Sequence, residues 1–307
     1  MIVSVVVPCH NQEEIVKANI NLLKNQSIVP DNIIVVNDHS TEFTIVSNDI
    51  VTVVDTKVQG RSSTRNLGIK VALDMGSDVI IFMDGDTVPE NDLFIENYLG
   101  MFPEEHTWGK FVFGTRKHAK RPEVDRCDEY LKAYHGECDA FTSLDRYPSD
   151  LLTANMDLII SDGPVEFDDL DHRDLRIVAG IPNGFNQLSM DEKIDHILTG
   201  MVTWSCNFAL NRVGLDQLRA HNLMVHGREF WFDDNDFNSG WGYEDVALGL
   251  DALFSGVDIF MTTKSDIIHY IHGRSDELFT HVEGRHKIMD RYRKLYKNQI
   301  MNAIREI

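Results

Sequence analysis

The order of apolar runs and helical patterns in the N-terminal part of the chain constrains the fold more than any other feature of the sequence. Short apolar runs predict strands at residues 2–7, 33–36, 50–54 and 79–83. Residues 12–25 and 62–75, which lie between such runs, have helical patterns. The runs are continuous rather than alternating, which is typical of strands buried on both faces. We therefore predict an α/β domain with a mostly parallel central sheet flanked by helices.

The rest of the chain gives fewer clear periods. Residues 116–200 contain acidic patches, glycines and prolines, and they predict an insertion or an elaborated loop region with a helix around 123–136. Residues 229–243 are rich in aromatic and acidic side chains. Further elements are predicted as a strand at 201–210, a helix at 244–255, short strands at 257–261 and 266–271, and an amphipathic C-terminal helix at 278–300 with Ile288, Tyr292, Leu295 and Tyr296 on its apolar side.

The charge balance limits the partners of the protein. Acidic residues number 49 and basic residues 29, which gives a net charge of −20. Such a surface repels nucleic acid and anionic membranes on average. Two basic islands, Arg116–Arg121 and Arg285–Lys297, depart from this trend. Solvated surface is the preferred explanation of both islands, and a local patch that binds an anionic acceptor is left open.

The four cysteines (Cys9, Cys127, Cys138 and Cys206) are scattered and form no CxxC pair, as expected of free thiols in a reducing compartment. The N-terminal apolar run lacks a basic flank and is too short for a signal sequence. No stretch approaches the ~20 apolar residues needed to span a bilayer. We therefore expect a soluble, cytoplasmic protein without a transmembrane segment.

Short polar residues follow three of the predicted strands. They are Pro8-Cys9-His10-Asn11, Asn37-Asp38-His39-Ser40 and Asp84-Gly85-Asp86. In parallel sheets of this kind, ligands bind beyond the carboxyl ends of the strands. Asp84 and Asp86 lie two residues apart, so in an extended segment their side chains point to the same side and repel each other unless a cation lies between them. Oxygen ligands favour Mg²⁺ or Mn²⁺. The alternative is that Asp-Gly-Asp is only a turn.

Four stretches in this order carry a resemblance to a known family: VVVPCHN, VVNDHS, GRSSTRNLG and FMDGDTVP. Together they resemble the nucleotide-sugar-binding half of family 2 glycosyltransferases, which have the Rossmann-like GT-A fold. The sequence departs from the family pattern at Asn37, where Asp is usual, and at Thr64, where Ala is usual.

The resemblance continues in the second half of the chain. Gly240-Trp241-Gly242-Tyr243-Glu244-Asp245 is similar to the GWGxED motif of a galactosyltransferase-type acceptor region. The stretch IIHYIHGR resembles the segment that supplies a metal-binding histidine in these enzymes. By position, His272 is the first choice for that ligand and His269 the second.

The resemblance implies a metal-dependent, inverting transfer of a hexose or pentose from a nucleoside diphosphate, usually UDP, to an acceptor hydroxyl. Mn²⁺ or Mg²⁺ would be held by Asp86 and His272, with Asp84 in contact through water or the donor ribose. The catalytic residues would be Asp245, as the general base, and Glu244, which would position the acceptor. The remaining implied donor residues are Pro8, His10, Asn11, Asp38, Arg65, Asn66 and Gly85, and the implied acceptor residues are Trp241, Gly242 and Glu244.

The resemblance also divides the chain, within a single GT-A domain that has a C-terminal helical extension. Residues 1–115 would form the donor-binding half, 116–200 the insertion, 201–275 the acceptor-binding and catalytic half, and 276–307 the C-terminal helix.

Other functions remain open at this point. A nucleotidyltransferase would show a glycine-rich loop after the first strand, where this chain has PCHNQEE. A non-catalytic sugar-binding or nucleotide-binding module would have no reason to combine a base, a metal site and a nucleotide pocket. The acceptor is not specified, and a phosphate-rich acceptor such as hydroxymethylated phage DNA is one alternative.

Overall fold

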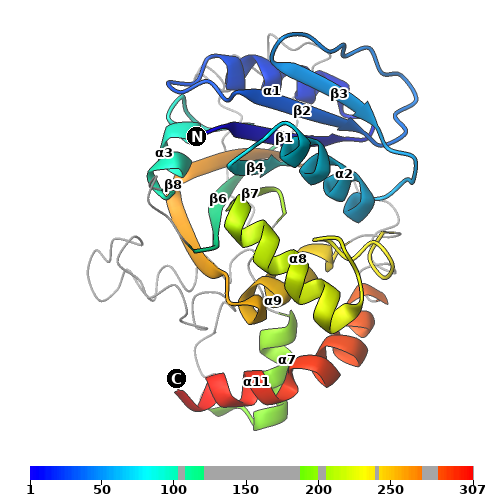
Figure 1. Cartoon of the computed structure of the whole chain (residues 1–307), viewed down its shortest axis with the longest axis vertical. Helices are drawn as coiled ribbons and strands as arrows, with labels where there is room; N and C mark the ends of the chain where they lie inside the picture. The colour runs from blue at the N-terminus through cyan, green and yellow to red at the C-terminus, as the bar shows by residue number, and fades with distance from the viewer. Residues whose placement is uncertain (103–107, 121–186, 200–204, 239–241, 272–282, 307) are drawn as a thin grey trace.

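The computed structural model describes residues 1–102, 108–120, 187–199, 205–238, 242–271 and 283–306 of the chain (Figure 1). The described strands form one eight-stranded sheet in the order β3-β2-β1-β4-β7-β6-β8-β5. Their bounds are β1 Val3–Cys9, β2 Asn32–Asn37, β3 Val51–Asp55, β4 Val79–Met83, β5 Thr87–Pro89, β6 Lys110–Lys120, β7 Asn207–Asn211 and β8 Asp258–Ile271.

The sheet combines a parallel half with a mixed half. Strands β1 to β4 pair in parallel, as the sequence predicts. Strand β7 runs antiparallel to both β4 and β6, whereas β6 and β8 are parallel to each other. The short strand β5 closes the edge antiparallel to β8. The mostly parallel central sheet is thus confirmed, and the reversal at β7 joins its two halves.

Helices cover both faces of the sheet. The described α-helices are α1 Glu13–Lys24, α2 Arg61–Asp74, α3 Phe94–Gly100, α7 Met190–Thr199, α8 Arg212–His226, α9 Glu244–Ser255 and α11 Arg293–Glu306. Val5 and Val7 of β1 belong to the hydrophobic core formed with α1 and α3, whereas Val6 belongs to the core formed with α2, α8 and α9. This alternation follows from the pleat of a strand that is buried on both faces.

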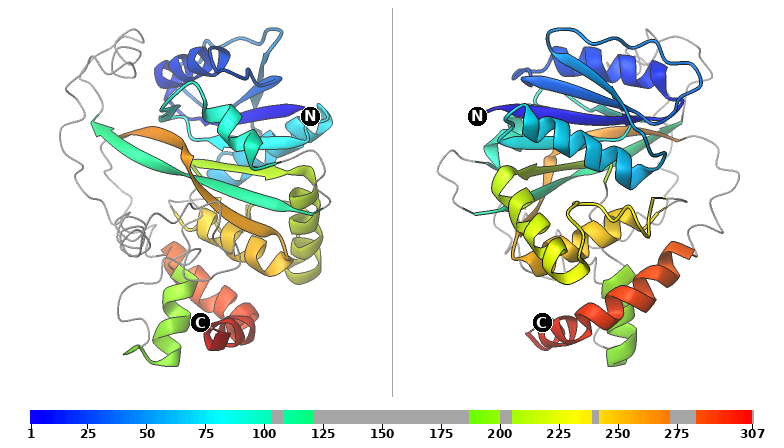
Figure 2. Two further views of the ribbon diagram at one scale, coloured as in Figure 1. Left: turned by 90° about the vertical axis from the view of Figure 1, so that its left-hand side faces the viewer. Right: turned by 45° about the vertical axis from the view of Figure 1, so that its right-hand side comes forward.

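The C-terminal segment, residues 283–306, packs with α7 at the end of the molecule opposite β3 (Figures 1 and 2). The predicted amphipathic helix is confirmed from residue 283 onward, and it extends to Glu306. Its regular α-helical spacing is interrupted by a π-helical turn, η4, at Ile288–Tyr292. Both ends of that turn, Ile288 and Tyr292, are buried in the core.

Several predictions about single elements need correction. The expected break between strands at 257–261 and 266–271 is wrong, because β8 runs through it unbroken. Thr262 and Ser265 are buried there, and Ser265 O accepts a hydrogen bond from Asn207 Nδ2 at 2.7 Å. The strand predicted at 201–210 is confirmed only from Asn207 onward, within the described residues, because Ser205 and Cys206 form a turn.

The described residues of the region predicted as an insertion, 116–200, form a strand and a helix. Strand β6 continues to Lys120, with a register shift against β8 between Gly114 and Arg116, and α7 occupies Met190–Thr199. The helix predicted around 123–136 lies outside the described residues. None of the helices that the structure describes is both long and apolar enough to cross a membrane. Of the four cysteines, Cys9 and Cys206 are buried, and the other two lie outside the described residues.

Candidate active site

Hydrogen bonds join the loops that follow β1 and β2 at the carboxyl edge of the sheet. His10 Nδ1–H donates to the backbone oxygen of Asp38. Asn11 Oδ1 accepts from the backbone N–H of Thr41 at 2.9 Å, and Ser40 Oγ accepts from Asn11 N–H at 3.0 Å. Asn11 and His39 have φ values of 56° and 57°, a left-handed conformation that is uncommon for residues other than glycine. Such conformations concentrate at functional sites.

The departure from the family pattern at Asn37 has a local explanation. Asn37 Nδ2 donates to Asp55 Oδ1 at 2.8 Å, and Asn37 Oδ1 accepts from Ser40 N–H at 3.0 Å. An aspartate at this position would place a second carboxylate against Asp55. The amide removes that repulsion and still shapes the turn that carries Asp38.

Asp38, predicted to contact the base or ribose, also supports the start of α2. Its two carboxylate oxygens lie 3.1 and 3.2 Å from the backbone nitrogen of Gly60, which donates to both. Gly60 has a φ of 137°, and a Cβ atom there would lie 2.3 Å from the backbone oxygen of Asn238. Only glycine fits this close approach. Asp38 therefore ties the loop after β2 to the first turn of α2.

Arg65 connects the two motifs that the sequence analysis assigned to donor and acceptor. Its guanidinium donates to Asp84 Oδ1 at 2.6 Å and to Glu244 Oε1 at 3.2 Å, and it lies over the ring of Phe232 at 5.6 Å. The residue is only 4% exposed. Burial opposes its charge, but the two carboxylates outweigh burial and raise the pKa of Arg65 above its ordinary value.

Asn66 is engaged with the backbone of a distant loop. Its Nδ2 donates to Phe232 O and its Oδ1 accepts from Phe232 N–H, both at 2.9 Å. Asn66 is 5% exposed. The side chain thus positions the loop around Phe232 against α2.

The predicted metal residue Asp86 lies next to His269. His269 Nε2 is 3.3 Å from Asp86 Oδ2, and both residues are buried. The pairing of β5 with β8 causes this, because Thr87 is opposite His269 in the register. The structure therefore brings the second choice, His269, to Asp86, while the first choice, His272, lies outside the described residues. A carboxylate oxygen and an imidazole nitrogen are ligands that suit Mn²⁺, so this pair fits a divalent ion.

The other two residues of the Asp-Gly-Asp triplet have different surroundings. Asp84 is half-buried and faces Arg65. A Cβ atom at Gly85 would lie 2.5 Å from Pro8 O and 2.7 Å from Gln12 Oε1. Glycine therefore lets the triplet pack directly on Pro8 at the end of β1 and on Gln12 in the loop that follows.

The start of α9 carries the predicted catalytic carboxylates. Tyr243 precedes the helix in a left-handed conformation with a φ of 70°. Glu244 is buried against Arg65, whereas Asp245 is half-buried and its Oδ1 accepts from Val246 N–H at 2.8 Å. Both carboxylates lie in the first turn of α9, at the positive end of the helix dipole. Trp241 lies outside the described residues, and Gly242 is half-buried.

Sequence reasoning missed the segment Arg228–Asn238, which contacts the start of α2. The only feature of the sequence that could have pointed to this segment is its content of aromatic and acidic residues. Nor did the sequence indicate that Arg65 would pair with Glu244, because the two residues are far apart in the chain and a buried ion pair leaves no local pattern.

The structure resembles solved glycosyltransferases. Over 90% of this chain and 60% of that chain it matches Staphylococcus aureus TarS 1–349 in complex with UDP-GlcNAc, with a TM-score of 0.51 and 15% identity. It also matches glucosyl-3-phosphoglycerate synthase from Mycobacterium tuberculosis in complex with Mn²⁺, UDP and glucosyl-3-phosphoglycerate, over 95% of this chain and 79% of that chain, with a TM-score of 0.50 and 14% identity. The chain thus spans less than two thirds of the TarS structure. These likenesses define the GT-A fold.

A family model matches the N-terminal part of the sequence. Residues 4–136 match the model of glycosyl transferase family 2, in line with the resemblance seen in the sequence motifs of this part of the chain. A comparison with curated proteins gives no match. The family match ends before Gly240–Asp245, so the interpretation of that stretch as an acceptor motif stays a prediction.

Proposed function

We propose that this protein is a glycosyltransferase that moves a sugar from a UDP-sugar to an acceptor hydroxyl, with inversion of the anomeric centre. The observation that carries the proposal is the bridge that Arg65 makes between Asp84 and Glu244. It brings the Asp-Gly-Asp triplet and the start of α9 to one site at the carboxyl edge of the sheet. A donor diphosphate and an acceptor hydroxyl must meet in such a place for transfer to occur.

Support for UDP as the nucleotide comes from both structural relatives, which are complexes with UDP or UDP-GlcNAc. The nucleoside would lie on the loops after β1 and β2, near Pro8, His10, Asn11 and Asp38. The many hydrogen bonds within these loops hold their left-handed residues in place, so this surface is formed before the donor arrives.

A divalent ion, Mn²⁺ or Mg²⁺, would be held by Asp86 and His269, with His272 as the other predicted ligand. When bound, the ion would stabilise the negative charge that develops on the departing diphosphate. Asp84 would act differently, since its carboxylate already accepts a hydrogen bond from Arg65. Its role would be to orient Arg65 and, through water, the donor.

The proton of the acceptor hydroxyl would pass to Asp245. As the hydroxyl oxygen bonds to the anomeric carbon, the bond from that carbon to the diphosphate oxygen breaks and the proton moves to the Asp245 carboxylate. Attack from the face opposite the leaving group inverts the centre, by the logic that applies to inverting hydrolases. Asp245 suits this role better than Glu244, because Glu244 is buried against Arg65.

The basic island at Arg285–Lys297 gives little support to a phosphate-rich acceptor. Several of its cations are already paired with carboxylates or carbonyls of this chain. The pairs are Lys287 with Glu283 and Asp236 O, Arg291 with Asp233 and Asp236, Arg293 with Asp191 and Asp195, and Lys297 with Asp191. The side chains of the other island, Arg116–Arg121, lie outside the described residues. A neutral hydroxyl acceptor is therefore the simpler proposal.

The first experiment is a thermal-shift panel of UDP, GDP, CDP and dTDP, each with and without Mn²⁺. We expect UDP with Mn²⁺ to raise the melting temperature, because a ligand present at about 100 times its dissociation constant stabilises the folded state by about 2.7 kcal/mol. Asp86→Asn should lose this shift. Asp92→Asn, an exposed carboxylate nearby, should keep it. A panel with no shift in the unmodified protein would contradict the assignment of the donor.

The second experiment separates binding from chemistry. UDP release from UDP-sugars is measured with a panel of hydroxyl acceptors. Asp245→Asn should bind UDP with Mn²⁺ normally and lose transfer. Normal transfer by this variant would show that another group is the base.

A further inference from the structure

The segment Arg228–Asn238, which we call the bridging loop, holds the start of α2. Asn238 Oδ1 accepts from Ser63 N–H at 3.0 Å and from Ser63 Oγ at 2.7 Å. Asn238 Nδ2 donates to Gln59 O at 2.9 Å. Phe232 exchanges two hydrogen bonds with Asn66, as described above, and its ring lies under the Arg65 guanidinium. The loop therefore fixes the helix turn from which Arg65 reaches Asp84.

On its other side the bridging loop is held by the C-terminal segment. Asp233 is 1% exposed, and its Oδ1 accepts from the backbone N–H groups of Asn235 and Asp236 at 3.1 Å, which shapes the loop. Its Oδ2 accepts from Arg291 at 3.0 Å and from Arg228 at 2.8 Å. Arg291 also pairs with the Asp236 carboxylate. One side chain of the C-terminal segment thus clamps two carboxylates of the loop.

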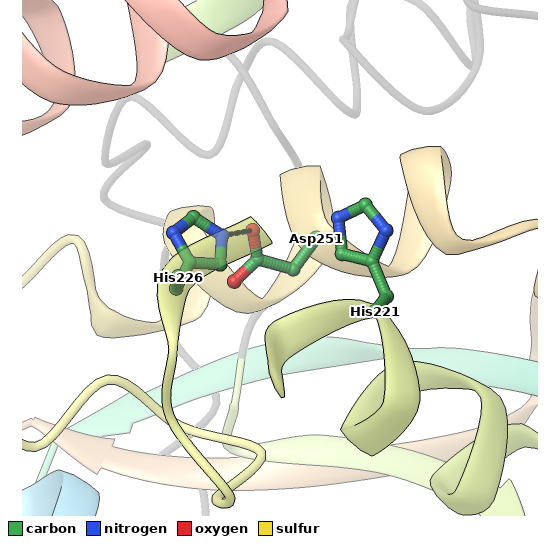
Figure 3. A group of neighbouring side chains, drawn as sticks. All are labelled: His221, His226 and Asp251. Atoms are coloured by element: carbon green, nitrogen blue, oxygen red, sulfur yellow. Dashed lines mark hydrogen bonds and ion pairs between the residues drawn. The ribbon is translucent and has the colours of Figure 1, made fainter. Parts of the chain in front are cut away.

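Arg228, which shares Asp233 with Arg291, also belongs to a buried polar network around Asp251 of α9 (Figure 3). Asp251 Oδ1 accepts from His226 Nε2–H and from the Tyr296 hydroxyl, both at 2.8 Å. Asp251 Oδ2 accepts from Arg228 and from the Tyr292 hydroxyl. Burial raises the pKa of Asp251, but the bond from His226 and the charge of Arg228 outweigh burial and lower it. The network joins α8, α9 and the C-terminal segment in one rigid unit.

Together with the neighbouring His221, two side chains of this network resemble a metal site. Ligand atoms of His221, His226 and Asp251 all lie within 4.8 Å of one another. Their contacts favour a proton network over an ion. His221 Nε2 lies 2.7 Å from the Tyr296 hydroxyl, which itself donates to Asp251. The guanidinium of Arg228 contacts the Asp251 carboxylate directly and would repel a cation bound there.

We propose that Arg291 is a positioning residue for the donor site. By clamping Asp233 and Asp236 it fixes the bridging loop, and the loop in turn holds the first turn of α2 in the orientation in which Arg65 faces Asp84. The C-terminal segment thereby takes part in donor binding without contacting the donor. This inference rests on the proposed function, since it assumes that UDP binds at the Arg65–Asp84 site.

Arg291 is a suitable place to test the proposal because its loss should leave the fold intact. Its side chain is 32% exposed, and without it Asp233 keeps its bond to Arg228. Arg293 offers a matched control on the same segment. It also clamps two carboxylates, Asp191 and Asp195, but these belong to α7 and not to the bridging loop.

The experiment compares Arg291→Met, Arg291→Lys and Arg293→Met in the full chain. The affinity for UDP with Mn²⁺ is measured by calorimetry, and hydrogen–deuterium exchange is measured over residues 60–66. We expect Arg291→Met to weaken UDP binding about 2- to 30-fold, the range for residues that act through a coupled network. Exchange over 60–66 should speed up in the same variant. Arg291→Lys should recover part of both effects, and Arg293→Met should change neither.

Two results would overturn the proposal. The first is that Arg291→Met leaves either the UDP affinity or the exchange over 60–66 unchanged. The second is that Arg291→Met and Arg293→Met change the UDP affinity and the exchange over 60–66 equally. That would mean that any loosening of the C-terminal segment has the same effect. If the unmodified protein does not bind UDP, the proposed donor is wrong, and the exchange comparison still decides whether Arg291 positions α2.

Discussion

Replacing Arg65 by methionine tests whether the bridge between Asp84 and Glu244 holds the site together. Methionine keeps much of the packing volume against Phe232 but removes the charge. The side chain of Glu244 is 5% exposed, so the variant leaves a buried carboxylate without its cation, whereas that of Asp84 is 29% exposed and water can solvate it. Removing one partner of a buried ion pair costs about 3–5 kcal/mol.

That free energy converts into a measurable shift. A chain of 307 residues has an unfolding entropy of about 0.6 kcal/mol/K near its melting temperature. The melting temperature of Arg65→Met should therefore fall by about 5–8 °C in a calorimetric scan. The double variant R65M/E244Q should be more stable than Arg65→Met alone, because glutamine removes the buried unpaired charge.

A control shows whether the effect comes from burial. Arg219 pairs with Glu229 at 3.8 Å on the surface, where both side chains are more than half exposed. Arg219→Met should change the free energy of unfolding by less than about 1 kcal/mol. The reasoning fails if Arg65→Met melts at the same temperature as the unmodified protein, or if adding Glu244→Gln gives no recovery.

Two further predictions concern stability. Gly60→Ala should destabilise the fold by about 1–3 kcal/mol in urea unfolding, because Gly60 has a positive φ and lies close to Asn238. Gly100→Ala is the control and should have little effect, because a Cβ atom at Gly100 would have no neighbour within 4 Å. Burial lowers the pKa of His221 below its ordinary value of 6.5, so the unfolded chain binds more protons and stability falls as the pH drops below 6.5. His221→Gln should flatten this dependence in urea unfolding between about pH 5 and 7, and an unchanged slope would contradict the assignment.

The strands that the sequence predicted well are those buried on both faces. Residues 79–83 form β4 with the predicted bounds, and every residue of that strand is buried. A continuous apolar run leaves little freedom in such a case, because each side chain must be removed from water on one face or the other. The predicted helix at 244–255 also has the observed bounds.

The elements that were missed depend on partners elsewhere in the chain. Strand β6 carries basic and polar residues near its end, and it is a strand because β7 and β8 pair with its two edges. Strand β8 was divided in the prediction because Thr262–Ser265 is polar. In the structure Thr262 pairs with Gly114 of β6, and the ladder resumes after a register shift with Ile267 opposite Arg116. The β propensity of a segment predicts little where pairing with distant strands determines whether the segment is a strand.

By itself, the sequence determined the parallel half of the sheet and the residues that follow its strands, because apolar runs and turn residues act locally. It also placed Asp84, Asp86, Glu244 and Asp245 at the ends of elements. Only the tertiary structure decided which of these groups meet. The register of β5 with β8 brings His269 to Asp86, and the arrangement of α2 and α9 at the edge of the sheet brings Arg65 to Glu244. Charge pairs across distant elements form because burial makes an unpaired charge costly, and that requirement has no local sequence pattern.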